Sequence, residues 1–169
     1  IAEEEGSIYE TRHRRKDGAI FPVEVSARRI AVEGKTFFQT IVRDISERRA
    51  AEENLRQSEE RYRNIFDNAV EGIFQSTPAG TYLTVNPAFA RMYGFAAPEE
   101  MIREVQDIQF QLYVRPEDRQ QVKQLLTEAG IIRGMEVAFN RKGGGTFWGS
   151  INAKAVKDAA GTIRYYDGT

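Results

Sequence analysis

The chain has 169 residues and a mass of 19.2 kDa, which allows one large domain or one domain with part of another. It carries 24 basic and 25 acidic residues, so its overall charge does not favour binding to nucleic acid. The absence of cysteine excludes disulfides, thiolate metal sites and cysteine nucleophiles, and no apolar run is long enough to span a membrane.

Residues 7–43 have the pattern of three antiparallel strands. Turn signals at Asp17-Gly18 and at Gly34 separate the strands, and in the middle strand apolar residues such as Val23 and Val25 alternate with polar ones. Three strands with a single apolar face are not stable by themselves in water. We therefore expect this part of the chain either to lack order or to pack against another copy.

A long helix is predicted from Asp44 to Phe66, because this stretch contains neither glycine nor proline and starts with a capping signal. The Asp44 carboxylate can accept hydrogen bonds from the free amides of the first turn, and Glu47 stands where a capping-box partner would. A narrow seam of coiled-coil spacing follows: Ala51, Leu55, Ser58, Tyr62 and Ile65. We expect this seam to pair with a second copy in a homodimer. A solvated linker helix is the alternative.

Part of the sequence occurs twice, at a distance of 126 positions. The residues repeated identically are Arg15, Lys16, Gly18, Phe21 and Ala27, which recur as Arg141, Lys142, Gly144, Phe147 and Ala153. With one inserted residue, Phe38 aligns with Tyr165. Because the turns and the alternation coincide as well, we interpret the match as an internal duplication.

The second copy contains the elements that the first one lacks. Its predicted order is two strands, short helices with an extended segment, one longer helix and three strands, at residues 72–76, 81–85, 86–94, 98–102, 108–114 (extended), 116–129, 131–141, 145–156 and 162–168. This order predicts an α+β domain with a five-stranded antiparallel sheet and short helices on one face. We divide the chain into the C-terminal part of a first domain (1–45), a linker helix (46–61) and a nearly complete second domain (62–169).

A resemblance to a known family rests on stretches that follow one another within residues 58–169: SEERYRNIFDNAVEGIF, GTYLTVNPAFARMYGF, VRPEDRQQV, RKGGGTFWGSINAKAV and GTIRYYDGT. Residues 9–49 add YETRHRRKDGAIFPVEVSARRI and GKTFFQTIVRDISERR. In order and spacing these resemble the PAS domain family of sensory modules. The resemblance implies a sheet wrapped around helices to enclose a small cavity, and a core that commonly works as a dimer in bacterial sensor kinases and cyclic-di-nucleotide enzymes.

The interior expected from this resemblance provides a candidate pocket for a small organic ligand, formed by Phe74, Phe89, Met92, Tyr93, Leu112, Val122, Trp148 and Ile151. An ordinary apolar core explains the same residues. Trp148 and its neighbour Phe147 point to opposite faces of their strand, and the sequence leaves open which of them faces inward. The Trp148 indole and the hydroxyls of Tyr93 and Tyr166 are the candidate polar contacts for a ligand.

The resemblance gives Asp44, Ser46 and Arg48 a role in transmitting a signal from the last strand into the helix, with Arg48 or Arg49 as the ion-pair partner of Asp44. No cofactor, metal site or catalytic constellation is expected. Haem-binding relatives take an axial histidine from the long helix, whereas the one histidine here, His13, lies in a charged strand. Light-sensing relatives that bind flavin covalently carry a cysteine, which this chain lacks.

We therefore expect a cytoplasmic sensory and dimerisation module without an enzymatic activity of its own. A change induced by a ligand or partner would pass through its flanking helices to an output domain outside this chain. The resemblance favours a sensor histidine kinase of a two-component system as the parent, with room for a membrane anchor elsewhere in it. The alternatives are a diguanylate cyclase parent and a ligand-free scaffold that only sets dimer geometry.

Overall fold

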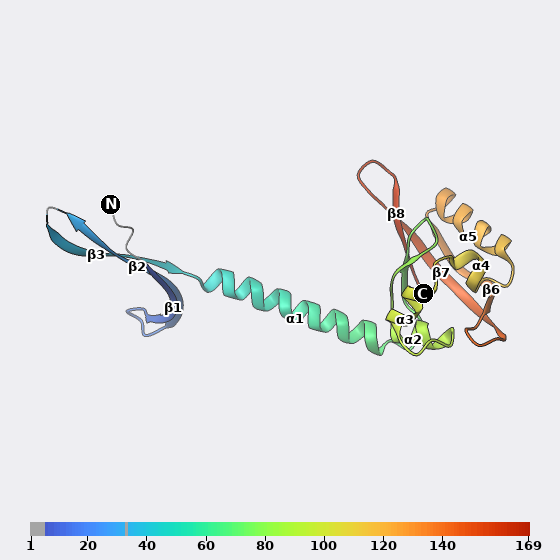
Figure 1. Ribbon diagram of the computed structural model, residues 1–169, viewed down its shortest axis with the longest axis horizontal. Coiled ribbons are helices and arrows are strands. Elements are labelled where there is room, and N and C mark those ends of the chain that lie inside the picture. Colours follow the sequence, from blue (N-terminus) through green and yellow to red (C-terminus); the bar gives the residue numbers. More distant parts are fainter. Residues whose placement is uncertain (1–5, 33) are drawn as a thin grey trace. The chain divides into compact units, whose positions relative to one another are not determined.

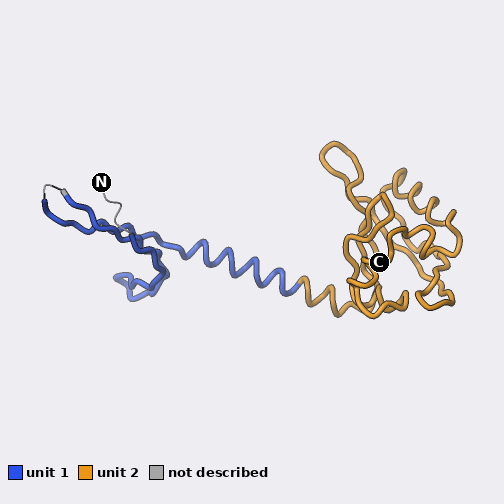
Figure 2. The backbone as a smooth tube through the Cα atoms, in the orientation of Figure 1, with its two compact units in different colours: residues 1–61 blue, residues 62–169 orange. Residues whose placement is uncertain are grey.

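The computed structural model describes residues 6–32 and 34–169. The chain forms two compact units, residues 1–61 and 62–169, which Figure 2 shows in separate colours. The helices and strands of both units are labelled in Figure 1. Within the described residues, no helix is both long and apolar enough to span a membrane.

The first unit begins with three antiparallel strands in the order β1-β2-β3: β1 (Ser7–Arg14), β2 (Ile20–Val32) and β3 (Lys35–Asp44). Gly18 closes the first turn with a φ of 89°, a conformation that a residue with a side chain rarely adopts. Most side chains of the sheet are exposed, apart from a small buried group of Val23, Val25 and Ile45. The strands are ordered, so the expectation of disorder is wrong, whereas packing against another copy remains a prediction.

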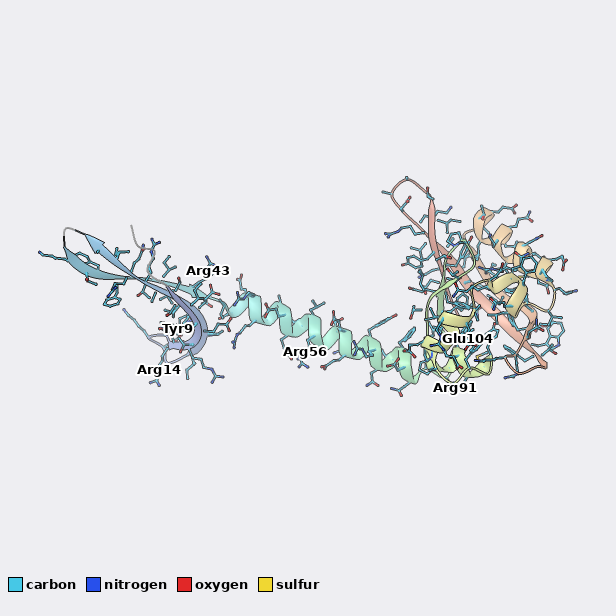
Figure 3. All side chains as sticks on the ribbon, in the orientation of Figure 1. Tyr9, Arg14, Arg43, Arg56, Arg91 and Glu104 are labelled. Atoms are coloured by element: carbon cyan, nitrogen blue, oxygen red, sulfur yellow. The ribbon has the colours of Figure 1, made fainter. Side chains whose placement is uncertain are left out.

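The long helix α1 (Ser46–Asn68) follows β3 directly. None of its residues is buried, and Figure 3 shows side chains radiating from it on all sides, Arg56 among them. Arg56 bonds to Glu53 and Glu60, one turn away in either direction, and such pairs stabilise a helix that has little packing of its own. The helix therefore depends on its local pairs and its cap, unless another chain covers it.

The second unit is an α+β domain, which confirms the predicted fold class. It contains two strands, four helices and three further strands: β4 (Phe74–Ser76), β5 (Tyr82–Val85), α2 (Pro87–Met92), α3 (Pro98–Glu104), α4 (Ile108–Leu112), α5 (Pro116–Glu128), β6 (Ile131–Asn140), β7 (Thr146–Lys157) and β8 (Ile163–Gly168). The strands form one antiparallel sheet in the order β5-β4-β8-β7-β6.

The core of the second unit lies between this sheet and the short helices. Along β7, Ile151 and Ala153 are buried while Trp148, Ser150 and Asn152 on the alternate positions are exposed. This period of two fixes one covered and one open face, as expected for a sheet with helices on one side only.

Residues 108–114 differ from the prediction, which made them extended. Ile108–Leu112 instead form the short helix α4, because Asp107 caps it by accepting hydrogen bonds from the amides of Gln109 and Phe110. The alternating residues that suggested a strand include Ile108 and Leu112, which are four positions apart and therefore lie on one face of a helix. This face is buried against the core, while Phe110 is exposed.

The strand order β1-β2-β3 recurs as β6-β7-β8, and the register corrects one part of the sequence alignment. Phe38 pairs with Arg29, and the residue paired with Ala155, 126 positions after Arg29, is Tyr166. The structural counterpart of Phe38 is therefore Tyr166 and not Tyr165. The strand pairing of β7 and β8 is irregular between Val156, which pairs with Tyr165, and Lys157, which pairs with Ile163. This irregularity adds one residue to the single insertion that the sequence alignment assumed.

Candidate ligand-binding site

The second unit encloses a cavity of about 310 Å³ between its sheet and helix α2. This volume lies at the small end of the range for pockets that hold small molecules. Aromatic side chains from both layers contribute to the wall, among them Phe74, Phe89, Tyr93, Phe139 and Phe147. Their rings contact one another, with centroids 4.9 to 5.6 Å apart along the series from Phe74 through Phe89, Tyr93 and Phe139 to Phe147.

The structure brings five of the predicted pocket residues to the cavity wall: Phe74, Phe89, Met92, Tyr93 and Ile151. Leu112 and Val122 are buried in the core but do not line the cavity. Tyr166, a candidate polar contact, is likewise buried without lining it. Whether the five wall residues contact a ligand is not decided by their position, and it remains a prediction.

Trp148 does not belong to the pocket, in contrast to its predicted place. Its side chain is 72% exposed, and its neighbour Phe147 lines the cavity. Successive residues of a strand point to opposite faces, so only one of the two can face inward. Phe147 takes the inner position because it pairs with Phe139, which is itself buried against Tyr93 and Tyr113.

The cavity also has a polar wall that the sequence did not predict: Glu71, Ser76, Tyr82, Tyr113, Arg119, Ser150, Asn152 and Thr169. Arg119 is 3% exposed, and Ser76 is fully buried. One signal could have found Arg119, because it precedes the buried Val122 and Leu126 by three and seven positions and therefore lies on the same face of α5. Ser76 carries no such signal, since it ends a strand of only three residues.

The tyrosines that line the cavity remain neutral. Burial raises the pKa of Tyr82, Tyr93 and Tyr113 above the usual value of 10.0, and the positive charge of Arg119 lowers these pKa values only in part. Their hydroxyls can therefore donate or accept hydrogen bonds, but they supply no negative charge to the cavity.

Part of the cavity wall is formed by residues that directly follow α1. Val70, Glu71 and Gly72 line it, two to four positions after the last residue of the helix. Gly72 is required here by space: a Cβ at this position would stand 2.8 Å from the Cδ2 atom of Phe89. The chain leaving α1 thus lies in contact with α2, which forms one wall of the cavity.

Asn86 joins the end of α1 to the start of α2. Its Nδ2 donates to the carbonyls of Phe66 (3.1 Å) and Glu71 (2.9 Å), and its Oδ1 accepts from the amides of Phe89 (2.8 Å) and Ile73 (2.9 Å). The side chain is fully buried and uses every hydrogen bond available to it. One side chain thus connects the backbone of Phe89, whose ring lines the cavity, with the backbone of Phe66 in α1.

In the first unit, Asp44 links β3 to α1. Its Oδ1 accepts a hydrogen bond from the amide of Ser46 at 2.9 Å, and its Oδ2 pairs with Nη2 of Arg15 at 2.6 Å. Hydrogen bonds from Ser46, followed by the charge of Arg15, lower the pKa of Asp44 below its usual 3.8. The expected ion pair with Arg48 or Arg49 is wrong, because Arg15 reaches Asp44 across the face of Phe21, 4.2 Å from the ring centroid.

Arg48 and Arg49 instead hold the first turn of α1 to the sheet. Arg48 pairs with Glu10 at 2.6 Å and approaches Glu24 at 3.6 Å, and Arg49 also pairs with Glu10. Glu10 and Glu24 stand directly opposite each other on β1 and β2, where like charges repel. Arg48 relieves this repulsion by bridging the two carboxylates, so its contact is with the sheet and not with the cap of the helix.

The seam residues Leu55, Tyr62 and Ile65 are all exposed, each by more than three fifths. The smaller Ala51 and Ser58 of the same seam are exposed as well. The stripe thus has no cover among the described residues. This agrees with either interpretation of the helix, as a dimer surface or as a solvated linker.

Comparison with known families gives two matches. A family model described as "PAS fold" matches residues 60–169, which is more than half of the chain, and one described as "PAS domain" matches residues 2–47. The two matches overlap opposite ends of α1, at residues 46–47 and 60–68.

A curated relative and two solved structures resemble parts of the chain. Sporulation kinase E of Bacillus subtilis (strain 168) is 37% identical over 57 residues, a stretch that covers 34% of this chain and 8% of the kinase. The PAS domain of an HTR-like protein from Haloarcula marismortui has a TM-score of 0.56 at 19% identity, covering 71% of this chain and 96% of that one. The PAS domain of a protein from Colwellia psychrerythraea has a TM-score of 0.54 at 18% identity, covering 64% and 91%. At these identities the two structures show the fold alone.

Proposed function

The chain belongs to the PAS domain family, and from that premise we propose that it is a sensory module in which a small molecule held in the cavity changes the state of α1. The observation that carries the proposal is the position of Asn86, bonded both to Phe89 in the cavity wall and to Phe66 in the helix. An occupied cavity constrains Phe89, and Asn86 passes this constraint to the last turns of α1. The ligand acts by favouring one of two arrangements of this junction.

We propose the domain organisation expected from the sequence: residues 1–45 as the C-terminal part of a first PAS domain, 46–61 as the linker helix, and 62–169 as the second domain. The match of residues 2–47 to a PAS model and the shared order of β1–β3 and β6–β8 support the assignment. Asp44, Ser46 and Arg48 would then transmit a state of the first domain into α1, since they connect its sheet with the first turn.

A homodimer that pairs through the seam of α1 is part of the proposal. A helix of 23 residues without a buried residue gains little from packing within the described chain, and its exposed apolar stripe has coiled-coil spacing. Replacing Leu55 by glutamate places charges in the middle of the pairing surface. We expect Leu55→Glu to weaken the dimer at least tenfold in analytical ultracentrifugation, while Glu59→Gln, off the seam, leaves it unchanged. If Leu55→Glu left the association constant unchanged, the dimer seam would be wrong and α1 would be a solvated linker helix.

We further propose a sensor histidine kinase as the parent protein, with the present chain in its cytoplasmic part. The support is the 37% identity to sporulation kinase E, which extends over 57 residues only. The catalytic activity of such a parent would lie outside this chain, and the role of the chain would be to set the arrangement of the helices that lead to it.

The test of the sensory function uses the purified full chain. Native mass spectrometry should reveal a bound small molecule of defined mass, and its removal should change amide hydrogen exchange in the last turn of α1, residues 64–68. Asn86→Ala should abolish this response, whereas Asn68→Ala, which removes a local bond to Asn64, should preserve it. A mass without ligand, together with the same exchange before and after the removal step, would contradict sensing and favour the ligand-free scaffold.

A further inference from the structure

The guanidinium of Arg119 is the feature of the cavity that the sensory function leaves unexplained. Arg119 lines the cavity from α5 and is 3% exposed, and its guanidinium interacts with the Tyr113 hydroxyl, but its Nη2 atom has no hydrogen-bond partner among the described residues. Arginine keeps its charge at every physiological pH, so burial cannot neutralise it. A buried and unpaired charge is costly, and proteins rarely keep one without a counter-ion.

The surroundings provide no counter-ion for Arg119. The neighbouring Asp118 is paired with Arg115 at 3.1 Å, and no carboxylate of the described residues forms an ion pair with Arg119. The nearby tyrosines are neutral, because burial raises the pKa of each of them. The missing partner is therefore an anion.

A second unpaired group lines the same cavity. The Oγ atom of Ser76 is fully buried and has no partner in the described structure. Ser76 pairs with Tyr166 across β4 and β8, and the Arg119 guanidinium lies over the Tyr166 ring, 5.5 Å from its centroid. Ser76 and Arg119 thus border the same residue, one from the sheet and one from α5. A serine hydroxyl and a guanidinium can both donate to the oxygens of one carboxylate.

The remaining wall determines the rest of the ligand. Phe74, Phe89, Met92 and Phe147 form an apolar surface, and the cavity volume of 310 Å³ corresponds to about ten water molecules. An inorganic anion would leave this surface in contact with water. A molecule with one charged end and an aromatic or aliphatic body of comparable size would cover both parts of the wall.

We propose that the cavity binds a small monocarboxylic acid in its ionised form, with the carboxylate held by Nη2 of Arg119 and Oγ of Ser76 and the apolar body among the aromatic rings. The proposal rests on the sensory function and names the class of its ligand. It also assigns a role to Arg119 and Ser76, which the sequence analysis did not single out.

The first test compares benzoate with benzamide, which has the same shape and no charge, by isothermal titration calorimetry on the full chain. Benzoate should bind at least about tenfold more tightly, because only the ion forms a charge-assisted pair with Arg119. Phenylacetate and hexanoate extend the series in case the body of benzoate fits poorly. Equal binding of benzoate and benzamide would overturn the carboxylate inference and leave the sensory function standing. Failure of all three acids to bind would overturn the inference as well.

The second test separates a binding role of Arg119 from a structural one. Arg119→Met removes the charge at similar length, so it should raise the melting temperature of the ligand-free chain and abolish the additional rise that benzoate produces. Arg164→Met removes the same charge from an exposed position of β8 and should change neither quantity. A lower melting temperature for Arg119→Met, with the benzoate effect retained, would show that Arg119 serves packing and would overturn the proposal.

Discussion

The sheets β1–β3 and β6–β8 have the same strand order and the same alternation of side chains, and they differ in what covers them. Tyr166 on β8 is 2% exposed beneath the helices, while its counterpart Phe38 on β3 is 78% exposed. The apolar face of the first sheet keeps the pattern of a covered surface although nothing among the described residues covers Phe38. Alternation in the sequence therefore predicts which face is made for burial, and only the structure shows whether that face is buried.

The energetic basis of the two units differs accordingly. The second unit draws its stability from one continuous apolar core. The first relies on its strand pairing, a small buried group, and ion pairs such as Arg15–Asp44 and Arg48–Glu10 at its surface. Exposed ion pairs contribute little each, so matched substitutions in the two units should have very different effects.

The largest expected difference is between Phe139→Ala and Phe38→Ala. Phe139 is buried among Tyr93, Tyr113 and Phe147, and its loss should lower the free energy of unfolding of the second unit by about 3 to 5 kcal/mol. Amide hydrogen exchange of the buried strands β6–β8, followed in guanidinium, measures unfolding of this unit. Phe38→Ala should change the opening free energy of β1–β3, measured by amide hydrogen exchange, by less than about 0.5 kcal/mol. Comparable losses at both sites would mean that another copy covers the first sheet in solution.

A smaller difference is expected between the residues that start α2 and α1. Asn86→Ala removes a cap and leaves two partly buried carbonyls without their donor, which should destabilise the second unit by about 1 to 2 kcal/mol. Asp44→Ala removes a cap of an exposed helix start and should only loosen the first turn of α1. Guanidinium unfolding measures the first effect and amide exchange at Ser46 the second. If Asn86→Ala and Asp44→Ala lowered the free energy of unfolding equally, the two units would not differ in how far their stability depends on a buried core.

The sequence sufficed for the fold because its strongest signals are local and periodic. The alternation in β7, the helices that begin at prolines and the glycine turns predict a five-stranded sheet and the order of elements along the chain, but not the order of strands within the sheet. The segment 108–114 was predicted wrongly, since residues 108 and 112 satisfy a helical period as well as an alternating one. Only the hydrogen bonds of Asp107, which depend on how the chain approaches α4, decide between them.

The candidate site was harder to predict, because much of it depends on contacts between residues that are far apart in the sequence. Its apolar wall follows from burial, and five of its residues were named in advance. Its polar wall depends on what each side chain faces, and a lone arginine in a charged helix is normally exposed. The choice between Phe147 and Trp148 shows the limit: adjacent positions of one strand are equally apolar, and packing against Phe139 decides which of them faces the cavity.

The smallest expected effect concerns acid and compares Asp44 with Glu100, a carboxylate at the surface of the second unit. Hydrogen bonds from Ser46 lower the pKa of Asp44 below 3.8, and the bond to Lys142 lowers the pKa of Glu100 below 4.5. A carboxylate whose pKa is lower in the folded state stabilises fully above its unfolded pKa. This contribution is lost as the pH falls through the folded pKa. The contact of Asp44 with Ser46 and the contact of Glu100 with Lys142 should therefore weaken only in acid, at a pH below the usual pKa values of 3.8 and 4.5.

Nuclear magnetic resonance of the Ser46 amide follows the first of these contacts directly, because this amide donates to Asp44. Its shift should titrate below pH 3.8 in the native chain, and Asp44→Asn should remove that titration. Glu100→Gln should leave the Ser46 signal unchanged and remove the acid response of the Ala96 amide, which donates to Glu100. If Glu100→Gln also altered Ser46, the acid responses of the two units would not be independent. Such a result would mean that a change at the surface of the second unit is transmitted through α1 to the first unit, and that the two units cannot be treated as separately stabilised.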